Sequence, residues 1–368
     1  MTKTGRIAIY NGLGQPLEIK EYPVPDPEPG AILVKVTLAN VCGSDLHMWR
    51  GDIDIAALGS PMPAVFGHEM TGTVAQLGSG VTTDSTGQPL TVGDRVVYRY
   101  FNPCGRCAPC LRGEDTACFA NLAYISSAEV FPHFRGAYAD YYYAYPNQTV
   151  IKVPDDLTDE MVAPVNCALA EVIYGLQKVR LGFGETIVIQ GAGGLGIYAT
   201  AVAREMGAHK IIVVEGIDER VELAKSFGAD EIVDMKQYKT PEERVMRVLE
   251  LTGFQGAHVV AELAGIPAAL PEGINMLGQG GRCLEIGNIS PGRTTEIDPA
   301  LLVMGSKTIY GVTFYDADAL KKSLELLSRT KDKYPFERIL SRKYPLENIN
   351  QAFEDQNNGL VSRSAIVP

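Results

Sequence analysis

The chain has 368 residues, 46% hydrophobic and 21% charged, so it can bury a large core and is long enough for two domains. Its net charge is −11, and no run of Lys or Arg is long enough to follow a phosphate backbone, which argues against nucleic-acid binding. A membrane helix needs about 18 consecutive apolar residues, and no stretch of this sequence approaches that length. The start, MTKTGRIAIY, does not resemble a signal peptide, so we expect a cytoplasmic protein with no membrane partner.

The first part of the chain is rich in short β-strand patterns. Runs at 32–38, 72–77, 95–98 and 149–153 are β-rich and bounded by Gly, Pro, Asn or Asp. Prolines cluster early, at 23, 25, 27 and 29, which suits an irregular β barrel better than helices. We therefore expect a β-rich domain up to about residue 165.

Three residues scattered along the chain have the chemistry of a catalytic zinc site. Cys42, His68 and Cys167 each lie in a separate motif, and two sulfurs with one imidazole leave a fourth position open on tetrahedral zinc. Glu69 can lie beside this metal or bind it briefly. Asp45, three residues after Cys42, would be a carboxylate that orients a ligand. Taken singly, a cysteine is more often a small buried hydrophobe, but the combination predicts a metal.

A second zinc site is predicted by four cysteines in C-x2-C-x2-C-x7-C spacing. Four thiolates complete a tetrahedral ion and leave no position open, which is typical of a structural zinc. The alternative is two oxidised pairs, but an odd total of seven cysteines without a signal peptide favours reduced thiols. The four are Cys104, Cys107, Cys110 and Cys118. The seventh, Cys283, is expected in the core.

From about residue 185 the pattern changes to short apolar runs that alternate with helical segments. The expected strands are 186–190, 210–214, 231–233, 258–262 and 283–286, with helices from about 195 and over 218–227. Such alternation predicts a parallel sheet with helices on both faces. The sheet would be complete by about Val312, so we expect the last 50 or so residues to return to the first domain.

A dinucleotide fingerprint follows the first of these strands. The segment G-A-G-G-L-G fits G-x-G-x-x-G, and it opens a helix whose N-terminus would face the phosphates. Its predicted cofactor-binding residues are Gly191, Gly193, Gly194, Leu195 and Gly196. Without the surrounding strand and helix, the same pattern could be a glycine-rich turn that binds no nucleotide.

The end of the second strand indicates which dinucleotide is bound. Glu215 could accept hydrogen bonds from both adenosine-ribose hydroxyls and would repel a 2′-phosphate, which favours NAD over NADP. Arg220, five residues later, tempers this preference because a cation nearby could tolerate that phosphate.

Together these motifs resemble the zinc-dependent alcohol dehydrogenases of the medium-chain dehydrogenase/reductase family, and the likeness covers essentially the whole chain. It implies an α/β protein with a GroES-like, β-rich catalytic domain over 1–165 and 314–368, including a structural-zinc lobe at about 100–120. A Rossmann domain with a doubly wound parallel sheet would span 166–313. The resemblance also implies two zinc ions per chain, an active site between the domains, and a homodimer or homotetramer.

The resemblance further assigns a proton relay. Ser44 would bond the substrate oxygen and pass its proton through the cofactor ribose to His47 and solvent. A hydroxyl two residues after a zinc ligand and an imidazole three residues further on agree with such a relay. Gly287 and Arg363 are assigned to the cofactor site in the same way. The expected reaction is hydride transfer between a small alcohol and NAD(P), giving an aldehyde or ketone.

Two features depart from the family pattern. Glu171 stands where relatives usually carry a small hydroxyl residue, which hints at a polar substrate. The segment 122–145 is unusually aromatic and could line a substrate pocket or simply pack. A polyol or sugar dehydrogenase is the nearest alternative function. Zinc-free reductases of the same fold lack these ligands, and a non-catalytic nucleotide-binding protein would have no use for the relay.

Overall fold

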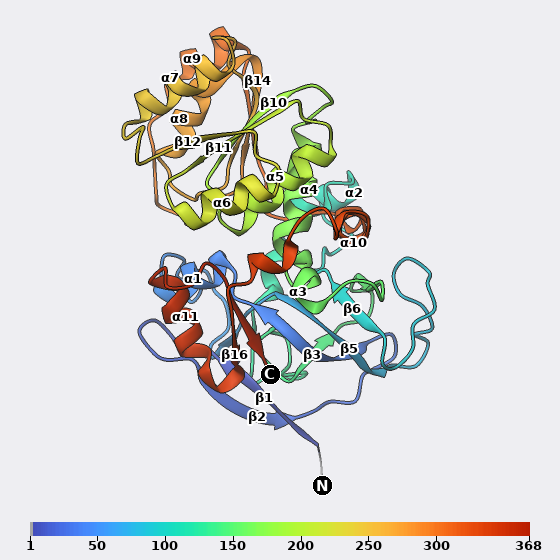
Figure 1. The fold of residues 1–368 in the computed structure, drawn as a ribbon. Coiled ribbons are helices and arrows are strands. Elements are labelled where there is room, and N and C mark those ends of the chain that lie inside the picture. The colour runs from blue at the N-terminus through green and yellow to red at the C-terminus, as the bar shows by residue number, and fades with distance from the viewer. Residues whose placement is uncertain (1–2) are drawn as a thin grey trace. The chain divides into compact units, whose positions relative to one another are not determined.

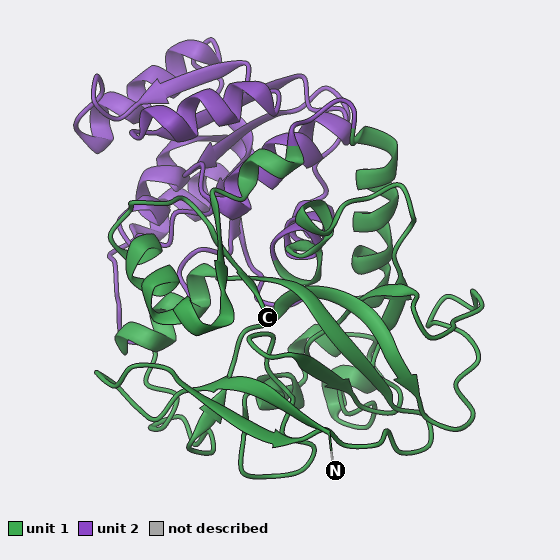
Figure 2. Cartoon of the chain, turned by 60° about the horizontal axis from the view of Figure 1, so that its bottom comes forward, with its two compact units in different colours: residues 1–167, 316–331, 336–368 green, residues 168–315, 332–335 purple. Residues whose placement is uncertain are grey.

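The computed structural model describes residues 3–368, which form two compact units. Of the described residues, unit 1 comprises 3–167, 316–331 and 336–368, and unit 2 comprises 168–315 and 332–335 (Figure 2). The chain thus leaves unit 1 directly after Cys167 and returns to it at Asp316.

Unit 2 contains a six-stranded, wholly parallel sheet in the order β12-β11-β10-β13-β14-β15 (Figure 1). The order reverses between β10 and β13, which is where a doubly wound sheet binds a dinucleotide. The strands are β10 (Thr186–Gln190), β11 (Lys210–Glu215), β12 (Glu231–Asp234), β13 (Ala257–Glu262), β14 (Leu277–Glu285) and β15 (Thr308–Gly311). The helices are α4 (Ala170–Lys178), α5 (Gly194–Glu205), α6 (Asp218–Ser226), α7 (Pro241–Leu251), α8 (Ala269–Met276) and α9 (Pro299–Gly305).

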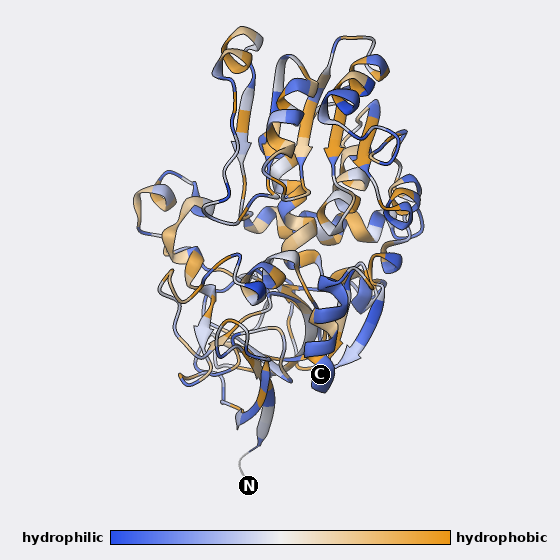
Figure 3. Cartoon of the chain, turned by 90° about the vertical axis from the view of Figure 1, so that its left-hand side faces the viewer, coloured by the Kyte–Doolittle hydropathy of each residue, from blue (hydrophilic) through white to orange (hydrophobic). Residues whose placement is uncertain are grey.

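The apolar runs form the core of this sheet. Val188, Ile212 and Val260 are fully buried on its central strands, and Cys283 is buried with them as expected. In Figure 3 the strands of this sheet are drawn as arrows that are largely orange, the colour of hydrophobic residues. Burial on both faces is the reason that parallel strands are continuous apolar runs rather than alternating ones. The predicted fold class is confirmed.

Unit 1 is β-rich, with a seven-stranded sheet in the order β16-β17-β3-β5-β6-β9 and β8 paired with β3. Its strands are β3 (Ile32–Asn40), β5 (Glu69–Leu77), β6 (Arg95–Tyr98), β8 (Tyr141–Ala144), β9 (Val150–Lys152), β16 (Arg342–Pro345) and β17 (Ser364–Val367). Two smaller sheets pair β1 (Thr4–Ile9) with β2 (Glu18–Pro23), and β4 (Ala64–Val65) with β7 (Ser126–Ser127). The helices are α1 (Gly43–Arg50), α2 (Ala108–Leu111), α3 (Asp159–Val162), α10 (Ala317–Thr330) and α11 (Ile349–Asn357).

The run of three tyrosines in the aromatic segment is part of the core. Tyr141, Tyr142 and Tyr143 lie on β8 and are 6%, 1% and 0% exposed. Tyr141 and Tyr143 pack with Phe134 in one hydrophobic cluster. These rings therefore stabilise the fold of unit 1 by burial. Among the described residues, no helix is both long and apolar enough to cross a membrane.

Candidate active site and metal centres

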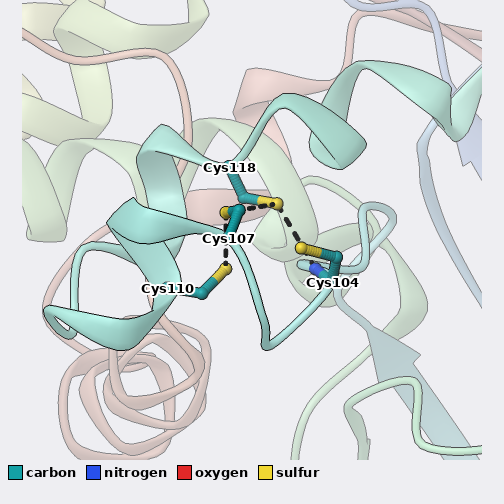
Figure 4. Close-up of side chains that lie close together, drawn as sticks. All are labelled: Cys104, Cys107, Cys110 and Cys118. Atoms are coloured by element: carbon teal, nitrogen blue, oxygen red, sulfur yellow. Dashed lines mark hydrogen bonds between the residues drawn. The ribbon is translucent and has the colours of Figure 1, made fainter.

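The four-cysteine loop brings its sulfurs to one point (Figure 4). All four ligand atoms lie within 4.8 Å of one another, and Cys107 Sγ is 3.4 Å from Cys110 Sγ and 3.7 Å from Cys118 Sγ. Sulfurs about 2.3 Å from a tetrahedral zinc stand roughly 3.8 Å apart, whereas a disulfide joins sulfurs at about 2.05 Å. The four cysteines are unbridged. The loop fits a zinc ion, and the alternative of oxidised pairs does not hold here.

Local structure explains this convergence. Cys107 is the N-cap of α2, so Cys110 follows it one turn later, and Cys118 lies just after the 3-10 turn Asp115–Ala117. The backbone N–H of Cys104 donates to Cys118 Sγ at 3.3 Å, which closes the loop.

The second cluster contains Cys42, His68, Glu69 and Cys167, again with ligand atoms within 4.8 Å of one another. Cys42 Sγ and Cys167 Sγ are 4.0 Å apart. Pairing of β3 with β5 places Asn40 opposite Glu69, which brings the segment after β3 beside the start of β5. His68, Glu69 and Cys167 are 1%, 0% and 6% exposed. The donor set and its spacing fit a zinc ion, and all four residues belong to unit 1.

The position before His68 requires glycine. Gly67 has φ +89°, and a Cβ there would lie 2.6 Å from the ring of Tyr138. The motif Gly-His-Glu thus allows this close approach.

Asp45 lies where an orienting carboxylate is needed. Its Oδ2 accepts hydrogen bonds from the Cys42 backbone N–H at 3.0 Å and from the Tyr138 hydroxyl at 2.6 Å. Its other oxygen lies 3.4 Å from His68 Nδ1, and neither of these two buried atoms has a hydrogen-bond partner elsewhere. This leaves Nε2 of His68 for a metal. Tyr138 has no motif of its own, and no signal in the sequence identifies it.

The electrostatics favour an ionised ligand. The hydrogen bond with Cys167 lowers the pKa of Cys42 well below its usual range, against the opposing effect of burial. Metal ligation requires this thiolate form. Burial raises the pKa of Glu69 to about 8, although Arg363 pairs with it. Arg363, assigned to the cofactor from the sequence, contacts this carboxylate in unit 1.

The two relay candidates lie on α1. Ser44 Oγ is 3.5 Å from His68 Nε2, so its hydroxyl lies beside the metal cluster. His47 lies three residues further along the helix, and its side chain is 19% exposed. Its Nδ1 is 2.9 Å from Asp52 Oδ2.

The glycine turn of unit 2 has the geometry of a dinucleotide fingerprint. Gly191 has φ +89° directly after β10, and Gly193 is the N-cap of α5. A Cβ on Gly196 would lie 1.9 Å from the Gly191 carbonyl oxygen. Gly194 and Leu195 form the first turn of the helix. The backbone can therefore approach a pyrophosphate closely at a helix N-terminus.

Glu215 lies at the end of β11 and is 6% exposed. Its Oε2 accepts from the Ala192 N–H at 2.9 Å, and its Oε1 accepts from the N–H groups of Gly216 and Ile217. Arg220 Nη1 is 3.9 Å from Oε2. The carboxylate thus joins the glycine turn to the end of the second strand.

Two further acids at this edge of the sheet were not anticipated from the sequence. Glu262 and Glu285 end the neighbouring strands β13 and β14 in register, and Asn288 Nδ2 donates to both carboxyl groups. Burial, and next Glu285, raise the pKa of Glu262 to about 8. Gly287 is required here because a Cβ would lie 2.4 Å from the Gly265 nitrogen.

Comparison with known proteins agrees with this geometry. Residues 28–155 match the alcohol dehydrogenase GroES-like domain, and residues 194–329 match the zinc-binding dehydrogenase domain. The chain is 34% identical over 351 residues to a 5-exo-hydroxycamphor dehydrogenase of Pseudomonas putida, covering 95% of each chain. It is 32% identical over 303 residues to an L-threonine 3-dehydrogenase of Pyrococcus horikoshii, covering 82% of this chain and 80% of the relative.

Among solved structures, an alcohol dehydrogenase from Thermotoga maritima superposes with a TM-score of 0.91 at 28% identity over the whole of both chains. Full-length similarity, both domain matches and two zinc-ligand clusters point to one conclusion. The chain belongs to the zinc-binding alcohol dehydrogenases of the medium-chain dehydrogenase/reductase family.

Proposed function

We propose that this chain oxidises a small alcohol to an aldehyde or ketone with NAD, and catalyses the reverse reduction. The observation that carries the proposal is the cluster of Cys42 with the buried His68 and Cys167, together with the Ser44 hydroxyl 3.5 Å from His68 Nε2. Zinc held there supplies a Lewis acid that lowers the pKa of the alcohol, and the nicotinamide supplies the hydride acceptor.

The residues of the chain have distinct roles in this proposal. Asp45 holds His68 so that one ring nitrogen faces the metal. Ser44 accepts the alcohol proton, and His47 delivers it to solvent. The buried Glu69 lies beside the ligands as a further carboxylate that can bind the metal briefly. Unit 1 would be the catalytic domain and unit 2 the nucleotide-binding domain.

The preference for NAD rests on Glu215. A carboxylate at the end of the second strand accepts hydrogen bonds from ribose hydroxyls and repels a 2′-phosphate. Arg220, at 3.9 Å, pairs with that carboxylate and lowers the repulsion. We assign Gly191, Gly193, Gly194, Leu195 and Gly196 to the pyrophosphate, and Gly287 and Arg363 to the rest of the cofactor. We also propose a homodimer or homotetramer.

A screen of NAD reduction with the zinc-loaded protein tests the function. The panel contains primary, secondary and cyclic alcohols, polyols and L-threonine, each with NAD and with NADP. We expect turnover with at least one mono-alcohol and NAD, and its loss in Cys167→Ala. Turnover with polyols alone would replace the proposal with the polyol dehydrogenase alternative. No turnover with any member, despite two bound zinc ions, would contradict it.

A further inference from the structure

The C-terminal end of α1 carries a polar cluster around His47. Arg50 and Asp52 lie on either side of Gly51, which ends the helix with φ +82°. Asp52 Oδ2 lies 2.9 Å from His47 Nδ1, 3.1 Å from Arg50 Nε and 2.7 Å from Arg50 Nη2. Arg50 Nη1 donates to Asn357 Oδ1 at 2.9 Å, so the guanidinium is anchored to α11 as well.

Hydrogen-bond chemistry selects one form of the imidazole ring. A carboxylate only accepts and a guanidinium only donates, so the His47 nitrogen 2.9 Å from Asp52 must carry the proton. The opposite tautomer would place a nitrogen lone pair against the carboxylate. That tautomer could accept from Arg50 Nη2, but this contact is 3.2 Å long, whereas Asp52 Oδ2 lies at 2.9 Å. The shorter contact is the one that requires a proton on Nδ1.

The Asp52 carboxylate is held in its ionised, proton-accepting form. Its hydrogen bonds with Arg50 lower the pKa of Asp52. The side chains of His47, Arg50 and Asp52 are 19%, 34% and 34% exposed, which leaves the cluster near solvent.

We infer that Asp52 is a positioning residue that fixes neutral His47 in the tautomer protonated at Nδ1, which leaves Nε2 as the proton acceptor of the relay. Arg50 holds the Asp52 carboxylate in place. The tautomer of His47 follows from the hydrogen bonds around it. Its effect on turnover rests on the proposed function, in which His47 takes part in the proton relay. A base oriented by a third group is a recurring arrangement in proton transfer.

The test reads the tautomer directly, by ¹⁵N NMR of the zinc-loaded protein labelled in its five histidines. The His47 signal is assigned by its loss in His47→Gln. In the wild type, at a pH where this ring is neutral, we expect the pattern of an Nδ1-protonated ring. In Asp52→Asn the amide can donate to Nδ1, so we expect a shift toward the Nε2-protonated form. Turnover should fall about 3-fold to 10-fold, with KM nearly unchanged.

Asp54→Asn is the matched control, because Asp54 lies in the same loop and accepts instead from the Ala57 N–H. It should leave the tautomer and turnover unchanged. An Nε2-protonated His47 in the wild type, or an unchanged tautomer in Asp52→Asn, would overturn the inference. The wild-type spectrum alone shows which nitrogen of His47 is protonated, even if a variant fails to fold. Normal turnover in Ser44→Ala with an Nδ1-protonated His47 would instead remove the relay and leave the tautomer assignment standing.

Discussion

At the residue scale, the relay makes a prediction about the order of its two members. In Ser44→Ala the alcohol loses its proton acceptor, so turnover should fall by about 10²-fold or more while zinc stays bound. His47 lies at the solvent end, where water can partly substitute, so His47→Gln should cost less. The loss of turnover in His47→Gln should be largest below neutral pH, where the relay releases protons into a solution with a higher proton concentration. Comparable losses at every pH would argue against this order.

A second residue-scale prediction concerns Glu215. Its carboxylate accepts from three backbone N–H groups and would accept from the ribose, so Glu215→Ser should weaken NAD binding. Binding of NADP should improve because the charge repulsion is gone. Dissociation constants for both cofactors, measured by fluorescence titration, check this. Glu219→Ser, at an exposed position of α6, is the control. A wild-type preference for NADP would show that Arg220 decides the choice.

The site residues predicted from the sequence lie in local motifs, whereas those that were missed act through contacts between distant parts of the chain. Cys42, His68 and the fingerprint glycines stand in local motifs, where spacing along the chain already limits the chemistry. Tyr138 and Glu285 become relevant only through contacts across the fold, the first with Asp45 and the second with Glu262. A lone tyrosine or glutamate in a strand pattern carries no such information.

At the element scale, the same distinction explains which strands were predicted. In unit 2 the apolar runs of β10, β11, β12 and β13 located these strands to within one residue. The strand β14 begins at Leu277 rather than at 283, and no range was predicted for β15, because neither strand is a continuous buried run. In unit 1, β5 begins at Glu69 rather than at residue 72, because its pairing with β3 extends to Asn40. The two-residue strands β4 and β7 exist only through pairing with each other. A pattern of two residues is too short to predict a strand.

A buried ion pair between α7 and α8 gives an element-scale prediction. Arg244 and Glu272 form two bonds, of 2.7 and 2.6 Å, and their side chains are 9% and 6% exposed. Arg244→Met would leave a buried carboxylate without its partner, which costs about 3 to 5 kcal/mol of unfolding free energy. Urea denaturation should show this loss. The double variant Arg244→Met with Glu272→Leu should recover much of it, and no recovery would mean that the pair is not the cause.

At the scale of the whole molecule, stability should depend on pH through Glu262. Its folded-state pKa of about 8 lies above the ordinary 4.5, so the folded state binds more protons between these values. This contribution to stability is complete below the lower value and is lost as pH rises through about 8. Glu262→Gln should therefore flatten the fall of the unfolding temperature over this window. Glu296→Gln, an exposed control, should not. An equally steep fall in Glu262→Gln would assign the dependence to another group.

The two metal centres lead to the last prediction, two zinc ions per chain with unequal lability. The four-cysteine loop saturates its ion, whereas the cluster of Cys42, His68 and Cys167 leaves a position that a chelator can occupy. Mild chelation should remove the ion of the Cys42, His68 and Cys167 cluster before the other one. Activity should be lost with it, and the protein should stay folded. Metal analysis should then find one ion in Cys167→Ala and one in Cys110→Ala, and two in the control Cys283→Ala, whose thiol lies in the core of unit 2. Because four ligands from one short loop hold the structural ion, its removal should disorder that loop and lower the unfolding temperature. A single ion in the wild type, or simultaneous loss of both from a folded protein, would contradict this assignment.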